Sequence, residues 1–413
     1  MNFNPFKEKP KSLESTIMSF TKISHKPFDK DGSAYTRVRQ ILMNGTEFEA
    51  VWCKHHFHRH CLDNDVRRQV ALLRRCEQQQ QKLVAGLKPV NESILVSTIG
   101  YEQLAVDLTA FLAQRTKNLA FKDALDFALL EDFDHLYRYA NLMENDTAEH
   151  AEKYVGSYTE IMPARPTVAH HRHPYDAVNF PLPKDASLVD KLDAMIITAA
   201  EQQTMNYYMN IAGFYKNTAG KNLYTEIGMI EEQHVTEYGS FLDATASPFV
   251  NLLMHEYTEA YLYYSMSLCE TDKDIKSLYE MLLEQEIAHL FVAKKLMEKH
   301  DKKSYEEVIG EGTFPEPIKL HENINYVRDI IKNTVNNTKV KEGYCLVKDL
   351  NDNADFFKYQ NKVCKNVDKA SSHLVIKKNI EKNGQDYRFE TKEHPLKELR
   401  DRKSDNNTLA RTK

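Results

Sequence analysis

The sequence is poor in glycine, proline and cysteine, and it has no long apolar run. Its 413 residues include 13 Gly, 13 Pro and 6 Cys, which excludes a collagen-like chain and a disulfide framework. No stretch approaches the roughly 18 uninterrupted apolar residues that span a bilayer, so no membrane partner is expected. The first residues contain no apolar segment of the secretory type, and we therefore predict a soluble, cytoplasmic protein.

Cysteine spacing and charge exclude further classes. The six cysteines form no Cys-x-x-Cys pair, so the chain encodes no local zinc ribbon, rubredoxin-type iron site or thioredoxin motif. Residues 341–413 carry 17 Lys and Arg against 12 Asp and Glu, whereas residues 1–340 carry 38 against 48. The acidic bulk argues against a nucleic-acid partner. The weakly basic end, with its Asn-Asn and Lys-Lys runs, is typical of a solvated tail.

Helical periodicity is the main feature that the sequence does contain. Apolar residues recur at spacings of three and four across 36–142 and 187–300, which predicts long amphipathic helices and almost no strand. Five prolines between 143 and 186 indicate a long irregular connection. We therefore predict an all-α fold with five parts: an N-terminal extension (1–35), a first bundle (36–142), a linker (143–186), a second bundle (187–301), and a loop-rich C-terminal region with a polar tail (302–413).

One pattern of acidic residues and histidines occurs four times. In each copy a Glu is followed thirty residues later by an acid and, three residues further on, by His or Gln. The copies are Glu47, Glu77 and Gln80; Glu102, Asp132 and His135; Glu201, Glu231 and His234; and Glu256, Glu286 and His289. An offset of 154 residues converts the first two copies into the last two, and an offset of 55 separates the copies within each repeat. The chain is therefore predicted to be duplicated, with a helical hairpin as its elementary unit.

These acids lie in the helix stripes that should face the core. Glu231 and His234 share a face because they are three residues apart, and Tyr224, Ile227 and Tyr238 continue that face. We expect no Lys or Arg at matching positions of the stripes, and an unpaired buried carboxylate costs at least several kcal/mol. Protons or metal ions must then compensate the charge. Two divalent cations among four carboxylates and two imidazoles would do so, and such ligands favour iron or manganese.

Both repeats resemble the ferritin-like di-iron and di-manganese carboxylate superfamily, which includes ferritins, rubrerythrins and manganese catalases. The second repeat is the more similar, through AEQQ at 200–203, EEQH at 231–234, HEYTEAY at 255–261 and EIAH at 286–289. The resemblance implies two tandem four-helix bundles, with a main site for two Fe or Mn ions in the second. It implies terminal ligands at Glu201 and Glu256, bridging ligands at Glu231 and Glu286, and one ligand each at His234 and His289. Glu259 resembles the additional carboxylate of rubrerythrins.

The first repeat departs from the family pattern, because Gln80 stands where a His is expected and Asp132 where a Glu is expected. The first repeat is therefore either a second, variant metal site or a bundle retained for packing; its candidate ligands are Glu47, Glu77, Gln80, Glu102, Asp132 and His135. Only 22 residues separate His234 from Glu256, which is too few for the long crossover of ferritins. We favour pairing of the two hairpins within each repeat. The alternative joins 102–135 to 201–234, and the first hairpin to the last.

The resemblance implies redox chemistry of O2 or peroxide at a di-metal centre, of the oxidase, peroxidase or oxygenase type. No motif in the sequence identifies the organic substrate or the electron donor. The sequence is compatible with a homo-oligomer. Two alternatives are a non-catalytic iron-binding or storage protein and a helical scaffold with vestigial sites. Two histidine-rich stretches, KHHFHRH at 54–60 and HHRHP at 170–174, are predicted to be surface or structural features.

Overall fold

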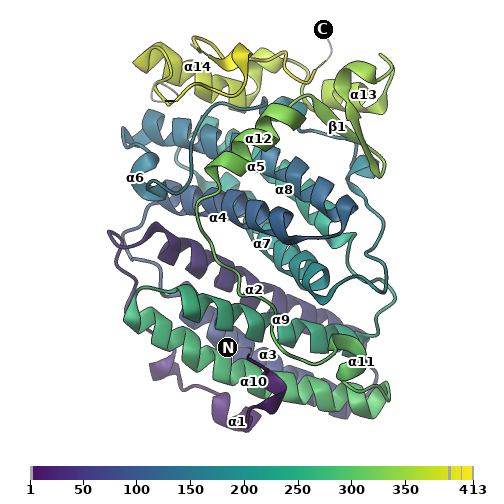
Figure 1. Cartoon of the computed structure of the whole chain (residues 1–413). Helices are drawn as coiled ribbons and strands as arrows, with labels where there is room; N and C mark the ends of the chain where they lie inside the picture. The colour runs from purple at the N-terminus through teal and green to yellow at the C-terminus, as the bar shows by residue number, and fades with distance from the viewer. Residues whose placement is uncertain (1–2, 389–391, 401, 412–413) are drawn as a thin grey trace. The chain divides into compact units, whose positions relative to one another are not determined.

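The computed structural model describes residues 3–388, 392–400 and 402–411 and is mainly helical (Figure 1), as predicted. Eight long helices occupy the two periodic segments. They are α2 (Ala34–His60), α3 (Asn64–Ala85), α4 (Ile94–Arg115), α5 (Leu119–Thr147), α7 (Leu188–Phe214), α8 (Thr218–Gly239), α9 (Pro248–Cys269) and α10 (Lys273–His300). Three short helices are α1 (Leu13–Thr16), α6 (Glu152–Val155) and α11 (Glu306–Ile309). Strands β1 (Asn337–Val340) and β2 (Gly343–Leu346), which the sequence did not reveal, pair antiparallel.

The 154-residue offset extends to the helix boundaries. Helices α2, α3 and α4 begin and end 154 residues before α7, α8 and α9, and α5 begins 154 residues before α10. The capping residues repeat as well. Ser93 and Ser247 precede α4 and α9, and their hydroxyl oxygens accept hydrogen bonds from the N–H groups of Val96 and Val250. A capping side chain satisfies a backbone donor at the helix start, so the two repeats encode the same helix starts.

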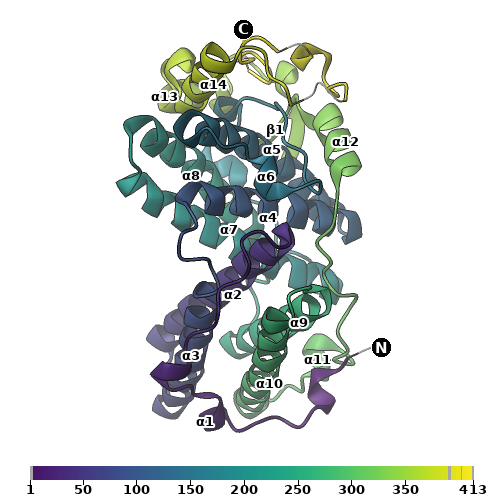
Figure 2. The same cartoon turned by 90° about the vertical axis from the view of Figure 1, so that its left-hand side faces the viewer.

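The eight helices are divided between two compact units, and neither unit is a continuous stretch of sequence. Unit 1 comprises residues 1–92, 183–200 and 242–320, and unit 2 comprises 93–182, 201–241 and 321–413. In unit 1 the α2/α3 hairpin packs against the α9/α10 hairpin (Figure 2). In unit 2 the α4/α5 hairpin packs against α8 and against the part of α7 that follows Ala200. Each unit therefore combines one hairpin from each repeat.

The favoured prediction, pairing of hairpins within each repeat, is wrong, and the alternative pairing is found. The compact units accordingly differ from the continuous bundles expected at 36–142 and 187–301. Connection length excludes one arrangement within a repeat. Eight residues join α3 to α4, and eight join α8 to α9. Such a segment reaches about 28 Å when fully extended, less than the roughly 33 Å of a 22-residue helix. The chain therefore cannot return along α3 as a ferritin crossover does, and in the structure α4 belongs to the other unit.

From residue 321 onward the C-terminal region is part of unit 2, and it is not the solvated tail that its composition predicts. Three helices form there, α12 (Ile324–Thr334), α13 (Asp355–Val363) and α14 (Ser371–Asn383). Helix α14 contacts α5 and α8, and α12 contacts α5. Further on, the Asp405 carboxylate, whose side chain is 8% exposed, lies 2.5 Å from the guanidinium of the buried Arg138 in α5. A buried guanidinium needs an acidic partner, and this one comes from the end of the chain.

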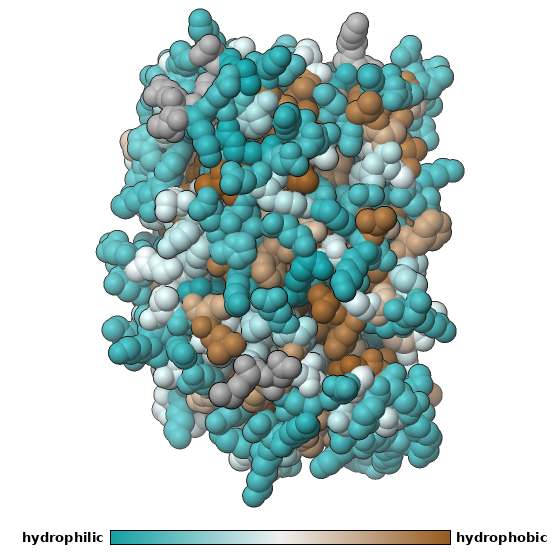
Figure 3. Space-filling model, viewed as in Figure 1, coloured by the Kyte–Doolittle hydropathy of each residue, from teal (hydrophilic) through white to brown (hydrophobic). Residues whose placement is uncertain are grey.

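No helix among the described residues is both long and apolar enough to cross a membrane. Hydrophilic side chains predominate on the face that Figure 3 shows, and the hydrophobic residues visible there form small groups. Many apolar side chains lie instead inside the helical units, where Leu108, Leu129 and Leu290 are fully buried. The acidic residues of the repeated pattern share this interior, and their arrangement defines two candidate metal centres.

Candidate metal centres

Six of the predicted ligands meet in the interior of unit 2. They are Glu102 of α4, Asp132 and His135 of α5, Glu201 of α7, and Glu231 and His234 of α8. None of them is more than 1% exposed. Their ligand atoms form two groups, each spanning at most 4.8 Å; one comprises Asp132, Glu201, Glu231 and His234, and the other comprises Glu102, His135 and Glu231. Glu231 belongs to both groups.

Glu231 lies between two imidazoles. Its Oε1 is 2.9 Å from Nδ1 of His135, and its Oε2 is 3.2 Å from Nδ1 of His234. Burial raises the pKa of Glu231, but the two histidines outweigh burial and lower this pKa to about 2. Because its two oxygens face different histidines, the Glu231 carboxylate is placed to bridge two ions.

Other carboxylates of this site share one weak partner: Nδ1 of His234 lies 3.3 Å from Asp132 and 3.9 Å from Glu201. Both oxygens of Asp132 and of Glu201, and Oε2 of Glu102, make no hydrogen bond of normal geometry to any described residue. Burial, reinforced by neighbouring carboxylates, raises the pKa of Glu102 and of Glu201. Unpaired buried carboxylates are costly, so these residues fit a positively charged group. Four carboxylates and two imidazoles form the donor set of a divalent metal pair.

A second layer of residues orients His234. Its Nε2 lies 3.0 Å from the Glu131 carboxylate, and Arg165 and Arg172 approach the same carboxylate at 2.9 and 3.3 Å. All four side chains are fully buried. A carboxylate on the outer ring nitrogen is typical of metal-binding histidines, because it fixes the ring and leaves the other nitrogen for the ion.

The linker supplies part of this second layer, which the sequence did not predict. Arg165 and Arg172 come from it, as does His170, whose Nδ1 lies 3.4 Å from Nε2 of His135. The HHRHP stretch was expected to be structural or incidental, and its His170 proves to be fully buried beside the site. Helical periodicity carries no information about the path of an irregular segment. The only available signal was a cluster of basic residues between prolines.

The remaining six predicted ligands meet in the interior of unit 1. They are Glu47 of α2, Glu77 and Gln80 of α3, Glu256 of α9, and Glu286 and His289 of α10. Each has a counterpart in unit 2 at an offset of 55 residues. Glu286 again lies between two partners: its Oε1 accepts a hydrogen bond of 2.6 Å from Gln80, and its Oε2 is 3.2 Å from Nδ1 of His289. The expected grouping of these residues into a main site and a variant site is therefore wrong. Each unit contains three residues of the expected main site and three of the expected variant site.

A buried lysine lies among the acids of unit 1. Nζ of Lys54 is 3.1 Å from Glu77 and 3.0 Å from Glu256, and it is 3.7 Å from Glu259. These carboxylates raise the pKa of Lys54, although burial alone would lower it. The expectation that the acidic helix stripes have no Lys or Arg partner is therefore wrong for unit 1. Lys54 follows Glu47 by seven residues, and two helical turns place both on one face. That spacing was the available signal.

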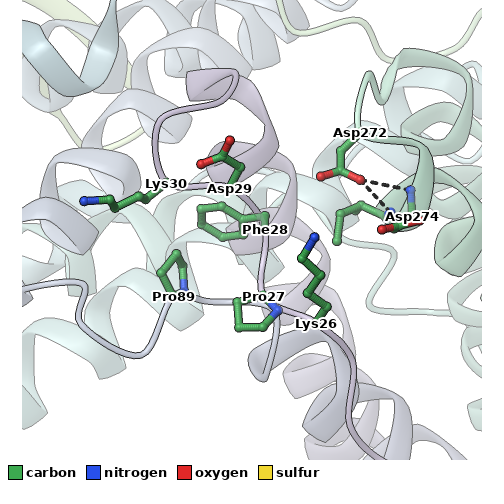
Figure 4. A pocket seen from close by; sticks show the side chains of 9 residues that line it. Lys26, Pro27, Phe28, Asp29, Lys30, Pro89, Asp272 and Asp274 are labelled. Carbon is green, nitrogen blue, oxygen red and sulfur yellow. Dashed lines mark hydrogen bonds between the residues drawn. The ribbon is translucent and has the colours of Figure 1, made fainter.

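Unit 1 also has a surface pocket whose lining includes none of the predicted ligands. It measures about 310 Å³, and Phe28, Pro89 and Asp272 are among its lining residues (Figure 4). The Asp272 carboxylate accepts hydrogen bonds from the N–H groups of Asp274 and Ile275, as an N-cap does. Its role at the start of α10 is therefore structural.

Comparison of the chain with protein-family models, with curated proteins and with solved structures finds no match. The two centres are thus interpreted from their own geometry. That geometry shows a helical protein with buried Glu and His clusters whose ligand atoms can hold metal ions.

Proposed function

We propose that the site of unit 2 binds a pair of iron or manganese ions and uses them for a redox reaction of O2 or peroxide. The placement of Glu231 between two histidines is the main support, because it defines two adjacent positions with one shared ligand. Asp132, Glu201 and His234 would serve one position, and Glu102 and His135 the other. The bound pair would supply electrons and open positions for the oxidant.

Deep burial of the ligands favours a small oxidant. The six side chains are at most 1% exposed, so O2 or peroxide has easier access than a large substrate. Exclusion of water also strengthens every charge interaction within the site. The outer partners Glu131 and His170 hold the two imidazoles in place, so the ligand geometry is preorganised before any oxidant arrives.

Two buried phenols provide protons beside the ligands. The ring of Tyr238 lies 6.3 Å from that of His234. The ring of Tyr139 lies 5.1 Å from that of Tyr208, whose hydroxyl donates a hydrogen bond to the ligand Glu102. The hydroxyl oxygens of Tyr139 and Tyr238 make no hydrogen bond to a described residue. Burial, followed by the charge of Asp132, raises the pKa of Tyr238. Its hydroxyl therefore keeps its proton at neutral pH and can donate it to a reduced oxygen species.

The test is the reaction of anaerobically metal-loaded protein with each oxidant. Consumption of O2 in proportion to bound iron indicates an oxidase or oxygenase, and rapid O2 evolution from peroxide indicates a catalase. Glu231→Ala combined with His234→Ala should abolish either reaction. The control is Glu232→Ala, since Glu232 is exposed on the same helix. Stable metal uptake without reaction of either oxidant would contradict the proposal and indicate a non-catalytic iron-binding protein.

A further inference from the structure

The two centres differ at positions that matter for a metal ion. At the 55-residue offset, Lys54 corresponds to Thr109, Gln80 to His135, and Glu259 to Thr204. Unit 1 thus gains a buried ammonium and one more carboxylate, and it has an amide where unit 2 has an imidazole. The ammonium and the added carboxylate lie 3.7 Å apart, so two of these differences form one interaction.

Lys54 takes up ligand atoms that a metal ion would need. The candidate groups of unit 1 are Glu77, Glu256, Glu286 and His289, and Glu47, Glu77 and Glu259. Glu77 belongs to both groups, and Nζ of Lys54 is 3.1 Å from it. The same Nζ approaches Glu256 from the first group and Glu259 from the second. We propose that the Lys54 ammonium takes the place of a metal ion in unit 1, so that ion pairs hold this unit together and only unit 2 binds a metal pair.

Electrostatics supports this exclusion. An ion bound to Glu77 and Glu256 would lie within a few ångströms of a positive charge that is 1% exposed, and two buried like charges at that separation repel strongly. The Lys54 side chain is 1% exposed, so it cannot reach water without a rearrangement of the residues around it.

The other neighbours in unit 1 also favour a site without metal. Gln80 turns its amide nitrogen toward Glu286 and donates a hydrogen bond to it, where His135 presents a ring nitrogen to Glu231. The counterpart of Glu131 is Cys76, which accepts a hydrogen bond from Thr16. At this position His289 therefore has the thiol of Cys76 beside it and not a carboxylate, so the carboxylate partner typical of a metal-binding histidine is missing.

The inference uses the proposed metal binding of unit 2 for comparison, and its test isolates unit 1. The background variant is Glu231→Ala with His234→Ala, which removes the site of unit 2. After anaerobic incubation with Fe(II) and desalting, this background should retain less than about 0.2 iron per chain. Adding Lys54→Thr, Gln80→His and Glu259→Thr gives unit 1 the residues of unit 2 at these three positions, and the content should rise to about two iron ions per chain. The matched control is Lys299→Thr, an exposed lysine of α10, which should leave the content low.

Two results would overturn the inference. One is a background variant that keeps about two iron ions per chain with Lys54 intact. The other is a folded triple variant, judged by circular dichroism, that gains none. If the triple variant does not fold, a second variant tests the inference: Glu286→Ala with His289→Ala in the otherwise native chain. The inference requires the iron content of this variant to equal that of the native chain, and a lower content would contradict it. Absence of metal from the native chain would refute the proposed function of unit 2, while gain of metal by the triple variant would still support the role of Lys54.

Discussion

At the scale of single residues, Glu131 links the candidate centre to the surrounding charge network. It lies 3.0 Å from Nε2 of His234 on one side and between two arginines on the other. Together these partners lower the pKa of Glu131, although its burial acts in the opposite direction. A carboxylate in this position keeps the proton of His234 on Nε2 and leaves Nδ1 to face Asp132 and Glu231.

We therefore expect Glu131→Gln to weaken metal binding without removing any ligand. Loss of the outer carboxylate should lower the affinity of unit 2 for Fe(II) or Mn(II) by about 10- to 100-fold. Competitive titration against a chelating dye measures the effect, and Glu232→Gln on the exposed face of α8 is the control. Equal affinities for the two variants would show that Glu131 does not tune His234.

The sequence predicted individual ligands better than it predicted their surroundings. Glu231 and His234 could be recognised because an acid and an imidazole interrupt an otherwise apolar face. Lys54 and Glu131 went unrecognised for a different reason. A charged residue on a helix is usually solvated, and only the tertiary structure shows that these two are buried against an acid and an imidazole.

At the scale of elements, the irregular linker and the C-terminal region contact each other within unit 2. His394 joins them: its Nε2 donates a hydrogen bond of 2.6 Å to the carbonyl of Pro163, and its Nδ1 accepts one from the N–H of Leu396. The bond accepted by Nδ1 requires the neutral ring, because a protonated Nδ1 cannot accept. Burial lowers the pKa of His394 to about 4, whereas an unfolded histidine titrates near 6.5.

The protein should consequently lose the stabilisation that His394 provides as the solution becomes acidic. Below about pH 6.5 the unfolded state binds a proton that the folded state does not bind until about pH 4, so this contribution is complete above pH 6.5 and falls away toward pH 4. Denaturant unfolding of the native chain and of His394→Asn should show a difference in free energy that shrinks across this interval. A constant difference would mean that His394 does not titrate as its surroundings indicate.

Helix positions were predictable from the sequence, whereas helix partners were not. The repeated pattern locates eight helices, and the caps Ser93 and Ser247 show how local chemistry fixes their starts. Partner choice depended on the eight-residue connections after α3 and α8. These connections are shorter than the helices beside them, and comparing the two lengths excludes a ferritin-type crossover within one repeat.

At the scale of the whole molecule, each unit combines one hairpin of the first repeat with one hairpin of the second. The two hairpins together supply the residues of one site. The units have equivalent ligand positions and different charge partners: a lysine in unit 1, and arginines outside the ligand set in unit 2. The repeated pattern thus places acids and histidines at equivalent positions in both units. We propose that only the centre of unit 2 remains a metal site.

Metal removal should therefore destabilise one unit selectively. A ligand that binds only the folded state stabilises it in proportion to RT ln(1 + [L]/Kd), and this stabilisation disappears on chelation. Hydrogen exchange after treatment with a chelator should increase in α4, α5 and α8 and stay unchanged in α2, α3, α9 and α10. A similar increase in both sets of helices would contradict a site confined to unit 2.

The central claim is tested most directly by the metal content of three forms of the chain after anaerobic loading. We predict about two iron or manganese ions per native chain, the same number in Glu286→Ala with His289→Ala, and less than about 0.2 in Glu231→Ala with His234→Ala. These pairs occupy equivalent positions in the two units, so each controls for the other. A native chain without metal, or equal losses in the two variants, would contradict the account.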